Sequence, residues 1–258
     1  MRRTITLLSL LSLLVALAAA GTAGASRNAI TFKYCTDPTF PPMELATTSG
    51  KITGFDVEMA AKLAGTWGGK AVAVKTAFPG LIPALNAKKC DAVISGIFVT
   101  PDRKKQAGVV AYMASHRVLI VKAGNPKGIH GPNQLKGKVV AVQAGTKYEE
   151  YLKALKSKLG FTLQSYPGDN DAVAQVLIGR ADAVLTQDTS FAYQAGQHPG
   201  KIAIGYTFAA KDSFGIYFRK ADASALGTQI HDGVAQLKAN GALAKIAKKY
   251  KVPVADVK

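Results

Sequence analysis

The sequence predicts an α/β fold of two doubly wound lobes joined by a two-strand hinge. Short apolar strands alternate with amphipathic helices, which is typical of parallel sheets covered by helices. The alternation occurs in two series, separated by a break at residues 123–128 that contains Gly and Pro. A second, polar break at residues 209–213 precedes a further apolar strand. Two breaks imply two crossings between the lobes, and therefore a cleft that can close on a small ligand.

The first series of elements follows the amino-terminal segment. Apolar runs at residues 30–34, 71–75 and 91–95 are expected to be strands. Between them, residues 55–64 and 80–87 carry apolar positions at helical spacing and are expected to be helices.

The second series begins after an apolar run at residues 118–121. We expect strands at 138–142 and 181–185, with helices at 148–158 and 172–178 between them.

After the second break, the chain is expected to return to the first lobe. Residues 215–218 form a strand in this interpretation, and helices at 223–238 and 243–249 pack back on the first lobe. The predicted domains are a signal peptide at 1–25, a discontinuous first lobe made of 26–121 and 212–258, and a second lobe at 122–211.

The amino-terminal segment has the three parts of a secretory signal peptide. Arg2 and Arg3 precede a long apolar stretch, and small residues follow up to Ala25. We expect cleavage before Ser26, with a competing site after Ala20. Neither cleavage site is directly followed by a cysteine, the residue to which a lipid would be attached. We therefore expect a periplasmic protein without a lipid anchor.

The chain is strongly basic, with 33 lysines and arginines against 16 acidic residues and a net charge of +17. Charge of this sign can attract anionic partners or lipid. The lysines are scattered, however, and their short clusters are typical of solvated helix faces. We therefore predict no nucleic-acid function.

The two cysteines, Cys35 and Cys90, could form a disulfide in an exported protein. If Cys35 ends one strand and Cys90 begins its parallel neighbour, they lie roughly 16 Å apart along the strands at ~3.3 Å per residue. A disulfide needs Cα atoms within about 7 Å, so we predict that these cysteines are not bonded. The four histidines show no metal-ligand spacing, and we expect neither a metal nor a cofactor.

Arg103 is the leading candidate for ligand binding. Thr100 is expected to cap a short helix that begins with Pro101, which places Arg103 within one turn of a strand's carboxyl end. Ligands of open α/β sheets collect there, and a guanidinium can hold a carboxylate through two hydrogen bonds. The alternative is a surface arginine paired with Asp102.

Other candidates occupy loops that face the predicted cleft. Asp37 and Phe40 lie in a proline-stiffened loop after the first strand, and Phe78 precedes a helix. Gly145 and Thr146 link a strand to a helix and offer backbone N–H groups and a hydroxyl to an anion. Each phenylalanine could instead belong to the core, and Thr146 could serve only as a cap.

The second lobe offers one further candidate. Asp188 follows a strand and could accept hydrogen bonds from a ligand ammonium, or could cap the next helix. Ser95 precedes a glycine but has no neighbouring base, and no arrangement for nucleophilic or acid–base catalysis emerges. We predict that the protein is not an enzyme.

These segments together resemble the periplasmic substrate-binding proteins of amino-acid ABC transporters, solute-binding protein family 3, which have the type II periplasmic binding fold. The resemblance covers essentially residues 30–250. It rests on the following segments in order: TDPTFPP (36–42), GFDV (54–57), GLIPAL (80–85), ISG with TPDR (94–96 and 100–103), VAVQAGT (140–146) and GRADAV (179–184).

The resemblance implies a role for each candidate. Arg103 and Thr146 would hold the ligand α-carboxylate, Asp188 the ammonium and Asp37 the distal end of the ligand. Phe40 and Phe78 would flank its side chain. The remaining implied contacts come from the backbone of Ser95 and Gly96 and from the loop at Gly145.

The sequence departs from this family at three positions. Phe98 stands where many members have a threonine that contacts the ammonium. Gln187 rather than Asp188 has the usual spacing of the acidic residue, and Met43 replaces an aromatic residue. A carboxylate ligand without a free amine is therefore an open alternative.

The expected function is that of an extracytoplasmic receptor, which binds a small amino acid or related carboxylate and delivers it to an inner-membrane ABC permease. We expect a monomer. One alternative is a cleft enzyme of the same fold, such as a cyclohexadienyl-type dehydratase, which would need an acid–base pair. The other is a sensory module, which would need a membrane helix or a signalling domain.

Overall fold

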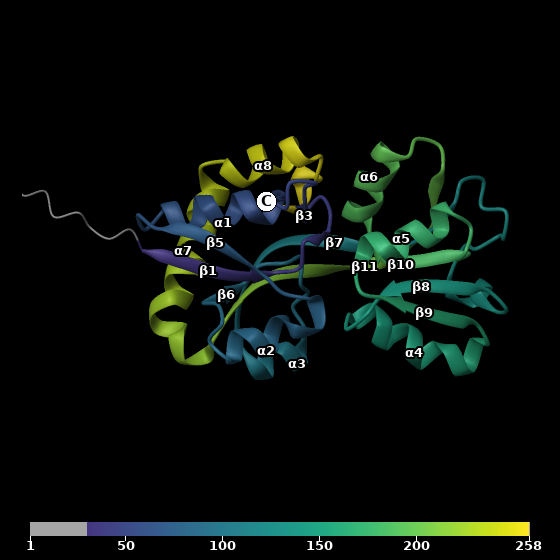
Figure 1. Cartoon of the computed structure of the whole chain (residues 1–258), viewed down its shortest axis with the longest axis horizontal. Coiled ribbons are helices and arrows are strands. Elements are labelled where there is room, and N and C mark those ends of the chain that lie inside the picture. Colours follow the sequence, from purple (N-terminus) through teal and green to yellow (C-terminus); the bar gives the residue numbers. More distant parts are fainter. Residues whose placement is uncertain (1–29, 258) are drawn as a thin grey trace, which may run out of the picture.

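One eight-stranded sheet runs through both halves of the molecule, in the order β5-β1-β6-β11-β7-β10-β8-β9. The computed structural model describes residues 30–257, so the predicted signal peptide and its cleavage sites lie outside the described residues. Figure 1 shows two α/β lobes connected by β7 and β11. The two-lobed α/β prediction is therefore confirmed, while the exact domain bounds stay a prediction.

The first lobe is built on strands that run parallel to one another. β1 (Thr31–Thr36) lies between β5 (Lys70–Lys75) and β6 (Ala92–Val93) and pairs in parallel with both. The helical segments of this lobe are α1 (Phe55–Gly65), η1 (Phe78–Gly80), α2 (Leu81–Asn86), α3 (Pro101–Gln106), η3 (Lys220–Asp222), η4 (Ala223–Gly227), α7 (Thr228–Ala239), α8 (Ala242–Tyr250) and η5 (Val254–Asp256). Helices α1, α7 and α8 pack on one another, which confirms that the carboxyl-terminal helices return to this lobe.

The second lobe repeats the parallel arrangement. β8 (Val139–Gln143) lies between β9 (Thr162–Tyr166) and β10 (Ala183–Gln187). Its helices are η2 (Pro132–Leu135), α4 (Lys147–Leu159), α5 (Asp169–Leu177) and α6 (Asp188–Gln197). Strand β9 was not predicted, since its burial pattern is mostly partial and its sequence TLQSY lacks an apolar run.

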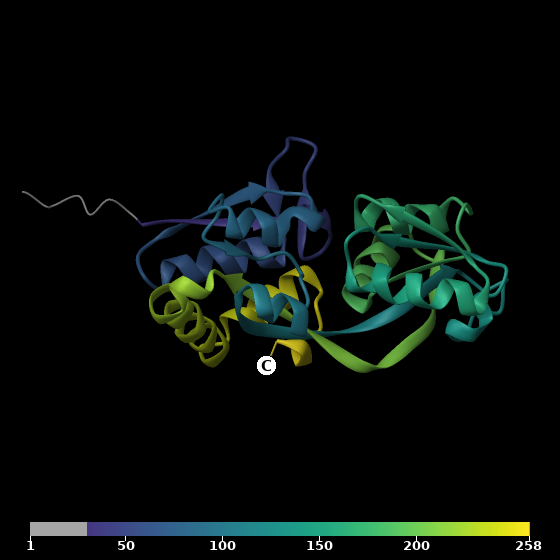
Figure 2. The same ribbon diagram turned by 90° about the horizontal axis from the view of Figure 1, so that it is seen from below.

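The hinge consists of two long antiparallel strands, β7 (Gly108–Lys122) and β11 (Ile202–Phe218). Figure 2 shows both strands passing between the lobes. The polar break predicted at residues 209–213 lies inside β11, where the paired register shifts between Thr207 and Lys211. This part of β11 is mostly exposed. Polar residues are therefore compatible with a continuous strand here.

A small three-stranded sheet, which was not predicted, shapes the edge of the first lobe. It contains β2 (Thr39–Phe40), β3 (Glu44–Ala46) and β4 (Ile52–Thr53). The peptide bond between Pro41 and Pro42 is cis. This sheet places Phe40 and Glu44 in the interior of the molecule.

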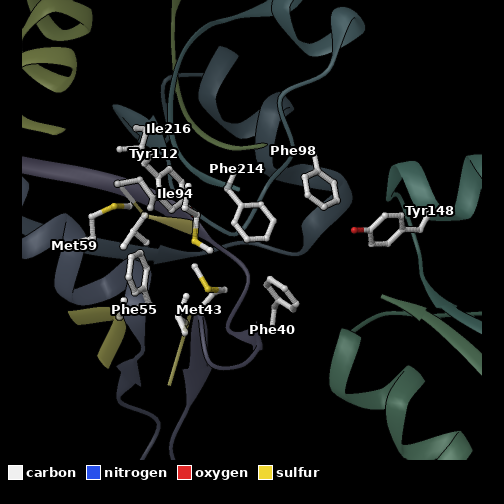
Figure 3. Close-up of a cluster of buried hydrophobic side chains, with 14 of the residues drawn as sticks. Phe40, Met43, Phe55, Met59, Ile94, Phe98, Tyr112, Tyr148, Phe214 and Ile216 are labelled. Carbon is white, nitrogen blue, oxygen red and sulfur yellow. The ribbon is translucent and has the colours of Figure 1, made fainter. Parts of the chain in front are cut away.

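The core lies on both faces of the large sheet because successive strand residues point to opposite faces. In β1, Tyr34 belongs to the cluster under α1, whereas Cys35 belongs to the cluster under α2. Figure 3 shows the first cluster extending through Met43, Tyr112 and Phe214 toward the second lobe. No helix among residues 30–257 is long and apolar enough to span a membrane.

The prediction that the cysteines are unbonded is wrong, because Cys35 and Cys90 form a disulfide with a Cα–Cα distance of 5.7 Å. Two assumptions failed. β6 contains only Ala92 and Val93, so Cys90 does not belong to an extended strand. Cys35 pairs with Val93 rather than standing beyond the end of β6. Cys90 reaches the sheet from the side of α2 and meets the Cys35 side chain on that face.

Candidate functional site

A small cavity of about 20 Å³ lies between the two lobes. The first lobe contributes five lining residues: Phe40, Phe78, Gly96, Phe98 and Arg103. The second lobe contributes eight: Gln143, Thr146, Lys147, Tyr148, Asp169, Leu185, Thr186 and Gln187. Seven of the predicted site residues therefore meet at one cavity. The other four, Asp37, Ser95, Gly145 and Asp188, do not line it.

The two lobes are in direct contact around this cavity. The Gln143 amide donates a hydrogen bond to Asp37 across the gap, at 3.1 Å, and the Lys147 ammonium pairs with Asp102 at 3.1 Å. Gly145 lies so close to Pro79 that a Cβ atom would come within 2.7 Å of its ring. These contacts hold the two lobes together beside the cavity.

Arg103 reaches the cavity from helix α3. The Thr100 hydroxyl accepts a hydrogen bond from the Arg103 backbone N–H at 3.2 Å, which confirms the predicted cap. Asp102 pairs with Lys105 and Lys147, so the alternative of an Arg103–Asp102 pair is not observed.

The guanidinium of Arg103 is fixed by uncharged groups. It donates a hydrogen bond to the Phe98 carbonyl at 3.1 Å and lies 5.6 Å from the centre of the Phe78 ring. Burial lowers the pKa of Arg103, although an arginine stays protonated in proteins. Among the described residues no carboxylate forms an ion pair with it. This cation can therefore receive a ligand anion.

Aromatic rings form the apolar walls. The rings of Phe98 and Tyr148 meet edge to face across the lobes, 5.3 Å apart, and Phe98 stacks on Phe214 at 5.1 Å. Figure 3 shows the Tyr148 hydroxyl pointing toward Phe98. Gly96 has φ +47°, and a Cβ there would lie 2.5 Å from the Phe40 ring, so this position requires glycine. Phe40 and Phe78, the two aromatic residues predicted to flank the ligand, both line the cavity.

The loop before α4 combines capping with a place at the cavity. The Thr146 hydroxyl accepts from the Glu149 N–H at 3.1 Å and donates to the Gln143 carbonyl at 2.8 Å. The Gly145 N–H donates to the Glu149 carboxylate at 2.9 Å. Thr146 therefore caps helix α4, which was the alternative to a role in ligand binding. The Gly145 N–H already has a hydrogen-bond partner within the protein.

Asp37 lies behind the cavity rather than in its wall. Its carboxylate accepts hydrogen bonds from the Phe78 N–H at 3.0 Å and from the Gln143 amide. Its own N–H donates to Ser95 Oγ at 2.9 Å. Burial raises the pKa of the Asp37 carboxyl. Both hydrogen bonds go to the same oxygen, Oδ2, of the Asp37 carboxylate.

The two candidates for the ammonium site point in different directions. Gln187 precedes the first residue of α6, makes no capping hydrogen bond with its side chain, and lines the cavity. Asp188 is the first residue of that helix, and its carboxylate accepts from Ser115 Oγ at 2.7 Å and from the His116 N–H at 3.1 Å. Both partners belong to hinge strand β7. The geometry therefore supports a structural role for Asp188 at the hinge.

Two buried acids that sequence reasoning missed hold the Ser95–Gly96 turn. Ser95 Oγ donates to Glu44 at 2.9 Å, and the Gly96 N–H donates to Asp56 at 2.7 Å. Tyr112 donates its hydroxyl to both oxygens of Asp56, at 2.8 and 2.9 Å. Burial raises the pKa of Glu44 well above its usual range and that of Asp56 to about 6. The turn's backbone is thus fixed from within the first lobe.

Asp169 lines the cavity but was not among the site residues predicted from the sequence. It is the only carboxylate among the described lining residues. It is 3% exposed, and its two oxygens accept hydrogen bonds from the hydroxyls of Thr186 and Ser190, each at 2.5 Å. Burial raises its pKa to about 6, although both hydrogen bonds act in the opposite direction. It opens helix α5 shortly after β9, and this position after a strand is the sequence signal that could have identified it.

Asp169→Asn is expected to stabilise the ligand-free protein above pH 6. A raised pKa means that the folded state favours the neutral carboxyl, so its contribution to stability falls as pH rises through about 6. The neutral amide avoids this cost, which we expect to be about 1 to 3 kcal/mol at pH 8. Urea unfolding of the wild type and of Asp169→Asn at pH 4.5 and pH 8 measures the difference in their free energies of unfolding. An equal stability difference at both pH values would contradict the expectation.

Among residues 30–257 no group of three or more His, Cys, Asp or Glu side chains is arranged to hold a metal ion.

Comparison with known proteins adds a family assignment. The family model for bacterial extracellular solute-binding proteins, family 3, matches residues 32–253. The chain is 30% identical over 214 residues to the L-cystine-binding protein TcyJ of Escherichia coli, covering 82% of this chain and 79% of that protein. It is 29% identical over 226 residues to the histidine-binding periplasmic protein of Salmonella typhimurium, covering 83% and 85%.

Solved structures show the same fold. An ancestral arginine-binding protein bound to arginine is similar with a TM-score of 0.80 and 32% identity, covering 85% of this chain and 97% of that one. An ancestral amino acid-binding protein described as a precursor of cyclohexadienyl dehydratase has a TM-score of 0.78 and 31% identity, covering 85% and 95%.

Proposed function

Because the chain belongs to the bacterial extracellular solute-binding proteins of family 3, we propose that it is an extracytoplasmic receptor that binds a small amino acid or related carboxylate. Binding takes place between the lobes, and the loaded protein delivers its ligand to an inner-membrane ABC permease. The observation that carries this proposal is the half-buried Arg103 guanidinium, which lines the cavity between the lobes and forms no ion pair with a described carboxylate.

The physical mechanism follows from the two lobes. A ligand carboxylate that pairs with Arg103 and contacts Thr146 would interact with both lobes at once. Such contacts are complete only when the lobes are closed, so the ligand favours the closed arrangement by its differential affinity. β7 and β11 provide the hinge for this motion. A permease can then distinguish the loaded form by its shape.

The relatives' names support an amino-acid ligand, since they describe binding of cystine, histidine and arginine. They also support a periplasmic location. The disulfide between Cys35 and Cys90 agrees with an oxidising compartment.

A cleft enzyme is the second candidate, because one structurally similar protein is described as a dehydratase precursor. Its chemistry would need a proton donor and an acceptor within the cavity. Asp169, with its pKa raised to about 6, is one titratable group there.

A thermal-shift screen of the protein from Ser26 onward, unfolded and refolded to remove carried ligand, tests the proposal. The standard amino acids and small carboxylates are the probes. A ligand at ~100 times its dissociation constant adds about 2.7 kcal/mol. For a chain of this length that corresponds to a rise of about 5 to 10 °C in Tm.

The screen separates the two candidates. A saturable shift with an amino acid or carboxylate, and no turnover, supports the receptor. Appearance of an aromatic product from a cyclohexadienyl acid, followed by ultraviolet absorbance, would favour the enzyme. Absence of any shift across the panel would contradict the receptor proposal.

A further inference from the structure

The charged groups at the cavity are not balanced within the protein. Among the described residues the lining contains two cations, Arg103 and Lys147, and one carboxylate, Asp169. The Lys147 ammonium is paired with Glu150 at 2.6 Å and with Asp102 at 3.1 Å. Its charge is therefore compensated, and Arg103 and Asp169 are the two charges that remain.

Asp169 has polar neighbours but no cationic one. The hydroxyls of Thr186 and Ser190 each donate to one of its oxygens, so they orient the carboxylate without neutralising it. Among residues 30–257 no lysine, arginine or histidine forms an ion pair with Asp169. A buried charge without a partner is costly, and a ligand group of opposite charge removes that cost.

Tyr148 gives a second, independent observation of an incomplete site. Its hydroxyl has no hydrogen bond of good geometry among the described residues, although the side chain is 4% exposed and lines the cavity. The Gln187 side chain, which also lines the cavity, interacts with this hydroxyl. Buried hydroxyls are almost always hydrogen-bonded in folded proteins. The cavity thus contains a cation and an anion that lack an ion pair, and a hydroxyl that lacks a hydrogen bond of good geometry.

We propose that Asp169, and not Asp188, binds the ammonium group of an amino-acid ligand whose carboxylate Arg103 holds. The proposal rests on the proposed receptor function. It moves the ammonium site from β10 and the start of α6 to the first residue of α5.

The two residues expected from sequence to hold the ammonium are less suited to it. Gln187 lines the cavity, but its amide carries no charge. Asp188 carries the charge, but it does not line the cavity, and its partners Ser115 and His116 hold its carboxylate at hinge strand β7. Asp169 combines a negative charge with a place in the lining.

The test compares Asp169→Asn with Asp171→Asn. Both changes remove one negative charge from the first turn of α5, but Asp171 is exposed and absent from the cavity lining. The probes are the amino acid that binds best in the screen and its 2-hydroxy acid, which keeps the carboxylate and replaces the ammonium by a hydroxyl. Isothermal titration calorimetry at pH 7.5 gives each Kd.

We expect the wild-type protein to prefer the amino acid over the 2-hydroxy acid by about 30-fold or more. Asp169→Asn should lose affinity for the amino acid by a similar factor and keep its Kd for the 2-hydroxy acid within about 3-fold. Asp171→Asn should match the wild type with both probes. A purely structural role of Asp169 would weaken both probes equally, which would overturn the assignment.

Failure of this assignment and failure of the receptor function are distinguishable. If the wild type and Asp169→Asn bind the amino acid equally well, the receptor function stands and Asp169 is not the ammonium site. If the wild type binds the 2-hydroxy acid as tightly as the amino acid, the ligand class is wrong although a carboxylate receptor remains. If the wild type binds neither, both proposals fall. Circular dichroism of each variant checks its folding.

Discussion

Arg103→Ala should reduce ligand affinity by about 30-fold to several thousand-fold, because removing one partner of a buried charge pair costs about 2 to 5 kcal/mol. The loss should arise at the cavity and not from unfolding. The guanidinium makes one hydrogen bond within the protein, to the Phe98 carbonyl, and no ion pair with the described carboxylates. Calorimetric titration with the ligand identified in the screen measures the effect.

Two further variants define what Arg103 supplies. Lys104→Ala is the matched control, because Lys104 belongs to the same helix but is exposed and absent from the cavity lining. Its Kd should stay within about 2-fold of the wild type. Arg103→Lys keeps the charge but lacks the planar fork, so it should recover only part of the affinity. Binding by Arg103→Ala within about 3-fold of the wild type would remove Arg103 from the site.

Loss of the disulfide should destabilise the folded protein by about 4 kcal/mol, as expected for a cross-link that closes a long loop. Cys35 and Cys90 are 55 residues apart in sequence. For a chain of this size such a loss lowers Tm by about 8 to 16 °C. The double variant Cys35→Ala, Cys90→Ala tests this in a thermal unfolding experiment.

The control separates the cross-link from packing, since both cysteines are buried and alanine leaves space behind. Wild-type protein unfolded and refolded with dithiothreitol keeps both sulfur atoms but not the bond. Its Tm should fall with that of the double variant, and the reductant should not change the Tm of the double variant. Identical unfolding of the oxidised and reduced wild-type protein would show that the bond does not contribute to stability.

The candidate site was predictable where residues follow strand ends. Phe40, Phe78, Arg103 and Thr146 all lie at the cavity, as the sequence suggested. Each comes soon after a strand or opens a helix, and the carboxyl ends of parallel strands meet at one edge of a sheet. Caps were predictable for the same local reason, as Thr100 illustrates.

The failures share a different cause, because they depend on which segments come together. Asp169 opens a helix after β9, a strand that lacks an apolar run and was not predicted. Asp188 looked like the acid of the site, but its position at the start of α6 turns its carboxylate to hinge strand β7. The disulfide was missed because β6 contains only Ala92 and Val93, so Cys90 precedes the strand and its Cα lies 5.7 Å from that of Cys35.

The alternating strands and helices and the two lobes were predictable from local signals, because periodicity, caps and turn residues act over a few neighbouring positions. The family was predictable from the resemblance of six short segments, and the family model confirms it. Which charges remain unpaired at the cavity depends on contacts between distant segments, and these were not predictable from the sequence. Lys147 is neutralised by Asp102 across the lobes and Asp188 is held by the hinge, while Arg103 and Asp169 keep no partner of opposite charge among the described residues. Such pairing depends on the sheet register and on the contacts between the lobes, which involve residues far apart in the sequence.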